Sequence, residues 1–307
     1  MEQAFVRWLR QRLPGHPRLS VGPGDDAAVL VPRAGMQDVV TSDLLADGVH
    51  FHLDQAGAQR VGRKALAVNL SDLAAMAAHP VAAVVSLLLP RHHAEKIGPQ
   101  LLEGMLPLVE TFGIAIAGGD TNTWDGKLVI SVTAFGEVDL DTGPLLRRGA
   151  RPGDAIIVTG SFGGSLMGRQ FDFIPRVHEV LALRKRFQLN AGIDVSDGLS
   201  LDLWRMCQES GCGAVIDTAR IPVSDALQQQ WPGDENVDRR LAHALGDGED
   251  FELILAVPAR DAERMAKDQA IPVRLTQIGH FVESKGLWQT SADGSLQPLP
   301  VCGYEHV

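Results

Sequence analysis

The stretch KALAVNLSDLAAM (residues 64–76) decides the first part of the fold, because it is rich in Ala and Leu and predicts a helix over 60–78. Apolar residues surround one acidic residue, Asp72, on nearly every face of this helix. A buried carboxylate without a partner is costly. Lys64, on a neighbouring face two turns away, is one candidate partner, and a metal ion is the alternative that we favour.

Short β-rich runs alternate with helical ones on both sides of this helix, which is typical of an α/β (α+β) fold. In the first half the runs predict strands at 38–45, 83–89, 113–118 and 128–138 and a helix at 94–112. A second series follows the basic linker LLRRGARPGD (145–154), with strands at 155–160, 191–195, 213–219 and 251–258, a helix after GSFGGS (160–165) and a helix at 199–210. The sequence therefore predicts two α/β domains, residues 1–138 and 149–307.

Composition excludes several classes of function. The chain has 307 residues, 45% of them hydrophobic and 21% charged, with a net charge of −10, so we expect an ordinary globular protein that binds neither nucleic acid nor a membrane. The N-terminal residues 1–15 predict a short amphipathic helix without a secretory apolar core, and no apolar run reaches transmembrane length. Three cysteines without CxxC spacing indicate reduced thiols and a cytoplasmic location.

Acidic residues recur where strands are predicted to end or helices to begin. They are Asp25 and Asp26 in GPGDD, Asp43 in TSD, Asp120 in GGD, Asp194 and Asp197 in IDVSDG, and Glu249 and Asp250 in GED. Most of them alone have a simpler interpretation: Asp43 and Asp197 as helix or turn caps, Asp25 and Asp26 as a solvated turn, Asp120 as part of a plain tight turn, and Glu249 and Asp250 as a solvated loop. Together with Asp72 they predict a site for a hard cation such as Mg²⁺, which usually works with phosphates and neutralises charge in phosphoryl transfer.

Two common signatures of phosphate chemistry are absent from the sequence: GxxxxGK[ST] and the HRD and DFG set of protein kinases. The glycine-rich GSFGGS has two interpretations, both open at this point. Its backbone N–H groups offer a cradle for phosphate, or it forms a plain turn between a strand and a helix.

Seven motifs follow one another in the order GDDAAVL, TSDLLADGVHF, KALAVNLSDLAAM, GGDT, RRGARPGD, IDVSDGL and GEDFEL, with GYEH (303–306) near the end. In this order they resemble the thiamine-monophosphate kinase family, in the superfamily of aminoimidazole ribonucleotide synthetase. The resemblance implies two domains: an N-terminal one that binds ATP and Mg²⁺ and pairs its mixed sheet across a homodimer, and a C-terminal α/β domain that completes the site. It also implies direct transfer of the γ-phosphate of ATP to thiamine monophosphate, assisted by several Mg²⁺ ions.

The resemblance assigns roles to individual positions. Metal ligands are expected at Asp26, Thr41, Ser42, Asp43, Asp72, Asp120, Asp194 and Asp197. Nucleotide contacts are expected at Gly119, Asp120, Arg147 and Ser196, and thiamine monophosphate contacts at His50, Glu249 and Val301. No catalytic base is expected, because the attacking phosphate oxygen is already ionised near neutral pH.

One position departs from the family's pattern, since Val301 stands where the family tends to place an aromatic residue against the thiamine rings. An aliphatic side chain offers no π-face to a cationic thiazolium, and Tyr304, Phe51 or Trp288 is a candidate substitute. Two other functions stay open: another ATP-dependent synthetase of the same superfamily, or a non-catalytic nucleotide-binding protein. The absence of selenocysteine or a reactive N-terminal Cys weighs against selenophosphate synthesis, and the full set of acidic residues weighs against a non-catalytic role.

Overall fold

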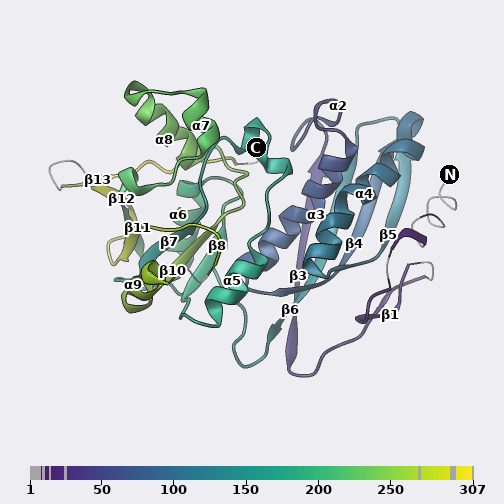
Figure 1. Ribbon diagram of the computed structural model, residues 1–307, viewed down its shortest axis with the longest axis horizontal. Helices are drawn as coiled ribbons and strands as arrows, with labels where there is room; N and C mark the ends of the chain where they lie inside the picture. Colours follow the sequence, from purple (N-terminus) through teal and green to yellow (C-terminus); the bar gives the residue numbers. More distant parts are fainter. Residues whose placement is uncertain are drawn as a thin grey trace. The chain divides into compact units, whose positions relative to one another are not determined.

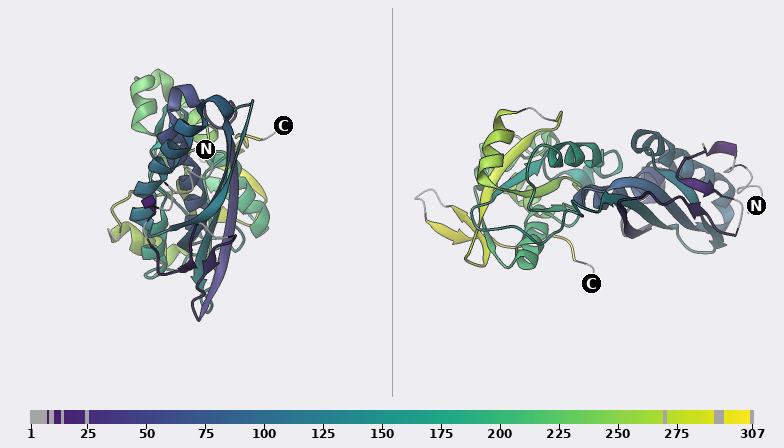
Figure 2. Two further views of the ribbon diagram at one scale, coloured as in Figure 1. Left: turned by 90° about the vertical axis from the view of Figure 1, so that its right-hand side faces the viewer. Right: turned by 90° about the horizontal axis from the view of Figure 1, so that it is seen from below.

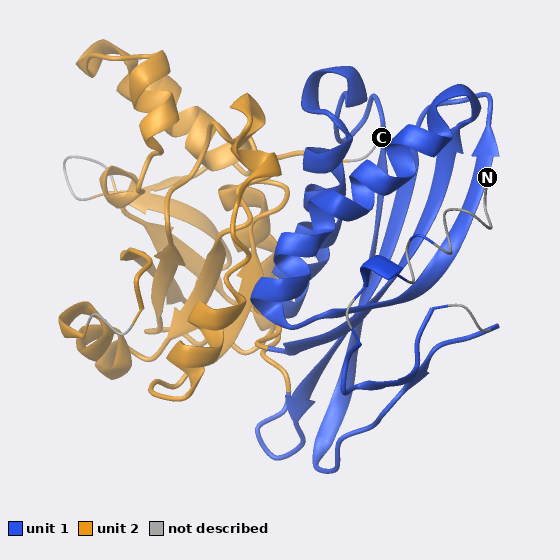
Figure 3. Cartoon of the chain, turned by 45° about the vertical axis from the view of Figure 1, so that its right-hand side comes forward, with its two compact units in different colours: residues 1–73, 78–143 blue, residues 74–77, 144–307 orange. Residues whose placement is uncertain are grey.

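The computed structural model describes residues 8, 11–13, 15–23, 26–268, 271–290 and 295–305. These residues form two compact units (Figure 3): unit 1 covers residues up to Leu73 together with Ala78–Gly143, and unit 2 covers Ala74–Ala77 together with residues from Pro144 onward. Most of the predicted N-terminal helix, Gly24 and Asp25 of GPGDD, and His306 of GYEH lie outside the described residues. Among the described helices none is both long and apolar enough to cross a membrane.

Unit 1 is a four-stranded mixed sheet with helices on one face (Figure 1). Its elements are β1 (Leu19–Val21), β2 (Val29–Leu30), β3 (Met36–Ala46), α2 (Leu53–Ala56), α3 (Ala58–Ala75), β4 (His79–Pro90), η1 (Arg91–His93), α4 (Ala94–Phe112), β5 (Ala115–Trp124) and β6 (Val129–Asp139). The strand order is β3-β6-β4-β5, in which only β4 and β5 run parallel. The last residues of α3 belong to unit 2, so this helix contributes to both units.

Alternation along β3 sorts the residues of TSD between the two faces of the sheet. Leu45 is buried on the helix-covered face, whereas Val40 and Leu44 are 57% and 60% exposed. The hydroxyl of Ser42 lies 2.9 Å from that of Thr133 on the neighbouring strand β6. Ser42 therefore lies on the open face, and Thr41 and Asp43 lie on the face toward α3.

A short ribbon of β1 and β2 packs on one side of unit 1, where Leu19 and Leu30 contact a cluster of buried residues from β4 and β5. Two arginines that flank the ribbon reach the same carboxylate: Arg18 and Arg33 contact Glu137 of β6 at 2.7 and 3.0 Å. Glu137 is only 2% exposed. This ion-pair cluster ties the segment that carries Asp26 to the sheet.

Unit 2 is a seven-stranded mixed sheet that is covered by several helices, α6 and α9 among them. Figure 2 gives two further views of its layers. Its elements are β7 (Ala155–Thr159), η2 (Ser165–Met167), η3 (Arg169–Phe171), α5 (Val177–Arg184), β8 (Ala191–Asp194), α6 (Leu199–Ser210), β9 (Gly213–Ile216), η4 (Thr218–Arg220), α7 (Asp225–Gln230), η5 (Asp234–Asn236), α8 (Val237–Gly246), β10 (Leu253–Val257), α9 (Ala259–Lys267), β11 (Leu275–Val282), β12 (Gly286–Thr290) and β13 (Leu296–Pro298). The strand order is β13-β12-β9-β11-β7-β10-β8, and only β9 and β12 are parallel.

The core of unit 2 lies between α6 and the sheet. Leu203 and Met206 of α6 pack with Ile156, Ile193 and Ile254 of three strands, and all five are at most 1% exposed. The helix ends at Gly211, whose φ of 70° is left-handed and suits glycine. This packing fixes the amino end of α6 beside the last residue of β8, which is where the IDVSDG motif lies.

Most predicted elements are present, and the α/β, two-domain class is confirmed. The helices at 94–112 and 199–210 have the predicted bounds. Two local predictions are wrong. Gly118, Gly119 and Asp120 lie in the middle of β5 and do not end a strand, because parallel pairing with β4 continues to Trp124. No α-helix directly follows GSFGGS; two short 3₁₀ turns stand there, and Gly163, Gly164 and Gly168 all have positive φ.

Candidate functional site

The first group of candidate residues lies where β3 meets α3 in unit 1. The Thr41 hydroxyl donates a hydrogen bond to the carboxylate of Asp72. Lys64, which is 1% exposed, donates from Nζ to the backbone oxygen of His50 at 2.8 Å. The His50 ring accepts the backbone N–H of Ala46 at 3.1 Å, so the chain that follows TSD folds back toward α3.

A second group lines a pocket of about 740 Å³ in unit 1. Its walls come from β4, β5, α4 and the segment around residues 22–28. Asp26 and Asp120 both line this pocket, together with Gly119 and the apolar Leu102 and Met105. The fold therefore places two acidic residues that are far apart in sequence in the lining of one pocket, together with apolar residues.

Gly119 owes its place in this pocket to a close approach between strands. A Cβ atom built at Gly119 would lie 1.8 Å from the backbone oxygen of Val85 on β4. No side chain fits there, so the parallel pairing of β4 and β5 requires glycine at this position. Asp120 follows directly, is exposed, and accepts the N–H of Thr121 at 2.9 Å.

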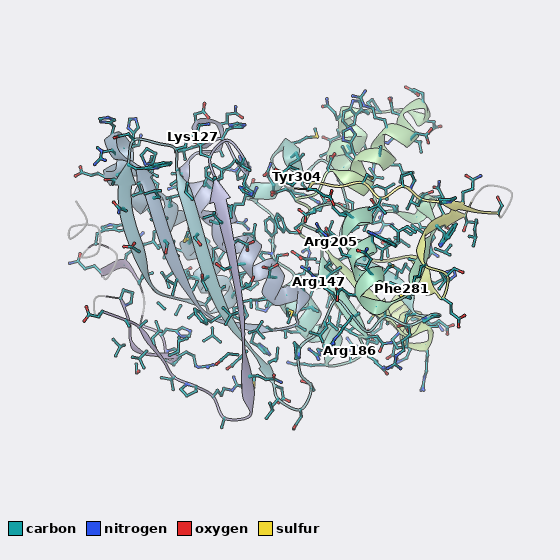
Figure 4. All side chains as sticks on the ribbon, turned by 180° about the vertical axis from the view of Figure 1, so that it is seen from behind. Lys127, Arg147, Arg186, Arg205, Phe281 and Tyr304 are labelled. Carbon is teal, nitrogen blue, oxygen red and sulfur yellow. The ribbon has the colours of Figure 1, made fainter. Side chains whose placement is uncertain are left out.

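In unit 2 the IDVSDG motif forms the turn between β8 and α6. Asp194 is the last residue of β8 and is 3% exposed. Behind the turn, Asp202 is 1% exposed, and burial raises its pKa to about 6 although backbone and arginine hydrogen bonds lower it. Arg205 pairs with both Asp197 and Asp202. Figure 4 labels Arg205 on α6.

The segment 248–251 crosses beside this turn in a strained conformation. Glu249 and Phe251 have φ of 57° and 51°, which non-glycine residues rarely adopt. The N–H of Glu249 donates to the backbone oxygen of Ser196 at 2.7 Å. The N–H of Phe251 donates to the backbone oxygen of Val195 at 2.8 Å. These two bonds hold Glu249 next to the IDVSDG turn.

Asp250 is buried, so the interpretation of GED as a solvated loop is wrong for this residue. It is 2% exposed and accepts hydrogen bonds from the Gly163 N–H at 3.0 Å and from Arg169 at 2.8 Å. Burial raises the pKa of Asp250 to about 6, against the lowering effect of Ser165, Gly163 and Arg169. The carboxylate thus serves as an internal anchor for residues 160–169.

The same contacts decide between the two interpretations of GSFGGS. Besides the Gly163 N–H, the Gly164 N–H is also engaged, by the carboxylate of Asp247 at 3.2 Å. Backbone donors that already bind the protein's own carboxylates are not available to a phosphate. GSFGGS is therefore a structural turn.

The C-terminal segment also packs on the IDVSDG turn. The Ser200 hydroxyl donates a hydrogen bond to the backbone oxygen of Cys302 at 2.7 Å and accepts one from the Cys302 N–H at 2.9 Å. The Tyr304 N–H donates to the backbone oxygen of Asp197 at 2.8 Å. Val301 is 43% exposed and Tyr304 is 49% exposed. Of the three aromatic residues considered in place of an aromatic at 301, Tyr304 lies on this segment, whereas Phe51 is buried in unit 1 and Trp288 lies on β12.

The structure thus gathers the candidate residues into groups within each unit. Thr41 and Asp72 form one group, and Asp26 and Asp120 share a pocket. Ser196, Asp197 and Glu249 meet at one turn, next to the segment that carries Val301. Ser42 is directed to the other face of its sheet, and Arg147 is exposed on the segment before β7.

Oxygen donors fit a magnesium ion at these positions, since carboxylates and hydroxyls are the only side-chain donors among the predicted ligands. Within the described part of the chain, no three His, Cys, Asp or Glu side chains stand close enough to hold a metal ion by themselves. Mg²⁺ is usually bound by one or two carboxylates, with water and substrate phosphates as its other ligands. Two acidic residues in the lining of one pocket are compatible with that mode of binding.

Sequence reasoning missed two residues that support the site, Asp202 and Arg205. It named Asp250 but did not predict that this side chain is buried. One signal was present, because Asp202 and Arg205 stand one helical turn apart directly after the SDG turn. For Asp250 the sequence held no signal, since its partners Gly163 and Arg169 are 87 and 81 residues away.

Comparison with known proteins gives the chain its family. The AIR synthase related protein N-terminal domain matches residues 24–138, and the corresponding C-terminal domain matches residues 171–287. The thiamine-monophosphate kinase of Rhodopirellula baltica is 40% identical over 314 residues, which cover 100% of this chain and 97% of that protein.

Solved structures agree. The thiamine-monophosphate kinase from Stenotrophomonas maltophilia superposes with a TM-score of 0.80 at 33% identity, over 96% of each chain. AaThiL complexed with AMPPCP and TMP superposes with a TM-score of 0.76 at 25% identity, over 100% of this chain and 96% of that chain. Similarity therefore extends along both units and holds in sequence as well as in fold, and the chain belongs to the thiamine-monophosphate kinase family of the AIR synthase related proteins.

Proposed function

We propose that this protein phosphorylates thiamine monophosphate with ATP, giving thiamine diphosphate and ADP. The observation that carries the proposal is the pocket of unit 1, which is lined by both Asp26 and Asp120 and by apolar residues of α4. Full-length similarity to thiamine-monophosphate kinases supports the choice of acceptor. AaThiL, which was solved with AMPPCP and TMP, supports the pairing of a nucleotide with that acceptor.

Magnesium is the proposed cation. Its ligands would come from Asp26, Thr41, Ser42, Asp43, Asp72, Asp120, Asp194 and Asp197. Bound there, Mg²⁺ would neutralise the charge of the β- and γ-phosphates as the phosphoryl group moves. The burial of Asp194 and the hydrogen bond from Thr41 to Asp72 support the proposal, because both carboxylates are held in fixed positions. For Ser42, whose side chain lies on the open face of the sheet, main-chain oxygen is the remaining donor.

The remaining residues would bind the two substrates. Gly119, Asp120, Arg147 and Ser196 are proposed to contact the nucleotide, and His50, Glu249 and Val301 to contact thiamine monophosphate. A phosphate oxygen of the acceptor attacks the γ-phosphorus, the bond to the β–γ bridging oxygen breaks, and ADP leaves. The acceptor oxygen is already ionised near neutral pH, so the protein has to position and neutralise charge and needs no strong base.

We also propose that the protein works as a homodimer in the cytoplasm. The open face of the unit 1 sheet carries Val40 and Leu44, both more than half exposed. Exposed apolar residues along one strand face favour burial against a partner. A second copy of this chain is the partner that the family resemblance implies.

The test is a direct assay for thiamine diphosphate from thiamine monophosphate, ATP and Mg²⁺, with EDTA as the control for the metal. ATP turnover without an acceptor, measured in parallel, separates the alternatives. Turnover with a precursor of aminoimidazole ribonucleotide but not with thiamine monophosphate would favour another synthetase of the superfamily. Nucleotide binding without any turnover would favour a non-catalytic protein.

A further inference from the structure

A buried carboxylate and a half-buried arginine support the turn that carries Asp197. The Asp202 carboxylate accepts the backbone N–H of Asp197 at 2.9 Å and that of Gly198 at 3.2 Å. Its other oxygen accepts Nη1 of Arg205 at 2.8 Å. The side chain of Asp202 is 2% exposed, so these donors take the place of water around a buried charge.

Arg205 extends this network outward to the side chain of Asp197. Its Nη1 donates to Oδ2 of Asp197 as well as to Asp202. The side chains of Arg205 and Asp197 are 33% and 26% exposed, so the contact lies near the surface of unit 2 while its anchor is buried. Within the described residues no hydrogen bond engages Oδ1 of Asp197, which leaves that oxygen for another ligand.

We propose that Arg205, anchored by Asp202, is a positioning residue that holds the Asp197 carboxylate ready to bind the divalent cation. The inference rests on the proposed function in one respect, because it takes Asp197 as a metal ligand. An unrestrained aspartate loses rotamer freedom when it binds an ion. A carboxylate already fixed through Oδ2 has less freedom to lose, so its remaining oxygen binds the cation more tightly.

Two effects of Arg205 on the cation have opposite signs, and this makes the inference testable. By charge alone, an arginine next to a metal ligand repels a cation, so its removal would tighten binding. By positioning, its removal would weaken binding. The variant Arg205→Gln keeps a polar side chain, removes the charge, and distinguishes the two effects by the direction of the change.

The experiment titrates the full-length protein with Mn²⁺ and follows free Mn²⁺ by electron paramagnetic resonance, without nucleotide. We expect Arg205→Gln to weaken Mn²⁺ binding about 10-fold, at the lower end of what outer partners of metal ligands contribute. Arg205→Lys should recover part of the loss, because an ammonium group can still bridge the two carboxylates. Arg220→Gln is the matched control, since Arg220 is an exposed arginine of unit 2 outside this network, and it should bind Mn²⁺ as the wild type does.

Mn²⁺ binding by Arg205→Gln that equals or exceeds that of the wild type would overturn the inference. Thermal unfolding checks that each variant is folded. If Arg205→Gln does not fold, Arg205→Lys is compared with the wild type instead. Mn²⁺ binding by Arg205→Lys that equals that of the wild type would then count against the inference. The outcome is independent of the acceptor. A wild type that binds Mn²⁺ but makes no thiamine diphosphate would refute the proposed function and leave this test intact.

Discussion

The Thr41 hydroxyl on β3 donates a hydrogen bond to the Asp72 carboxylate on α3, which joins two candidate ligands that are 31 residues apart. The contact places Asp72 at the boundary between helix and sheet, where an apolar helix presents its one acidic side chain. Thr41 can also donate a hydrogen bond to the amide oxygen of an asparagine, although a neutral acceptor forms a weaker bond than a carboxylate. A substitution that removes only the charge of Asp72 therefore separates chemistry from folding.

We expect Asp72→Asn to lower kcat about 100-fold or more, because a neutral amide stabilises a cation far less than a carboxylate and metal charge stabilisation contributes several kcal/mol. Turnover is measured with saturating Mg²⁺, and unfolding by urea checks the fold. The control is Asp54→Asn, which removes one charge from an exposed position of α2 in the same unit. Near-normal turnover of Asp72→Asn would remove Asp72 from the site.

The second prediction concerns Glu137, the buried partner of Arg18 and Arg33. The variant Glu137→Gln leaves Arg18, whose side chain is 18% exposed, without its carboxylate. Breaking a buried ion pair by removal of one partner costs about 3–5 kcal/mol, so we expect a loss of that size in the free energy of unfolding. The control Arg33→Gln removes a partner that is 64% exposed and should cost less than about 1 kcal/mol. Equal losses for the two variants would contradict this assignment.

The sequence predicted the helices and most strands well where a single periodicity ran through the segment. The strand through TSD and the helices at 94–112 and 199–210 show such patterns, and packing on one sheet face agrees with them. The segment GGDTNTW departs from any strand pattern, since Gly, Asp and Asn have low β propensity. It is a strand because β4 supplies a parallel partner and Gly119 allows the close approach, which is tertiary information.

The candidate site was predictable only in its local parts. The IDVSDG turn and the acidic residue of the apolar helix are visible in short windows of sequence. That Asp26 shares a pocket with Asp120 depends on packing of the β1–β2 ribbon against β4 and β5. That Asp250 is buried depends on Arg169 and on the turn of GSFGGS. Both facts follow from contacts between residues some 50 or more positions apart, which no periodicity encodes.

The third prediction tests the C-terminal segment through Gly303. A Cβ atom there would lie 2.5 Å from the backbone oxygen of Asp197 and 2.7 Å from Cβ of Leu201, so Gly303→Ala must displace the segment. Displacement breaks the hydrogen bond from Tyr304 to Asp197 and moves Val301. We expect KM for thiamine monophosphate to rise about 10-fold, equivalent to about 1.4 kcal/mol, with a smaller change for ATP.

Steady-state kinetics with each substrate varied in turn gives the two KM values. Gly15→Ala is the control, because a Cβ at Gly15 meets no atom within 4 Å. An unchanged KM for thiamine monophosphate in Gly303→Ala would mean that the C-terminal segment does not contribute to the acceptor site.

The last prediction concerns the three thiols, which are free but differ in exposure. Cys207 and Cys212 are buried and Cys302 is exposed. Burial raises the pKa of both buried thiols above the ordinary value of 9.0, and a neutral, inaccessible thiol is a poor nucleophile. Labelling of the native protein at pH 8 with a disulfide reagent should therefore modify Cys302 quickly and the other two only on unfolding. Rapid reaction of all three would contradict the burial of the pair.

The raised pKa values also set a pH dependence of stability. Above about pH 9 the two thiols ionise more readily in the unfolded chain than in the folded one, so the folded state holds more protons and its stability falls as pH rises. Below that pH both states are protonated and the effect vanishes. Cys207→Ala removes the more buried of these two groups, and the decline in unfolding free energy between pH 8.5 and 10 should then be shallower than in the wild type. Parallel declines in Cys207→Ala and the wild type would show that this thiol ionises equally in both states.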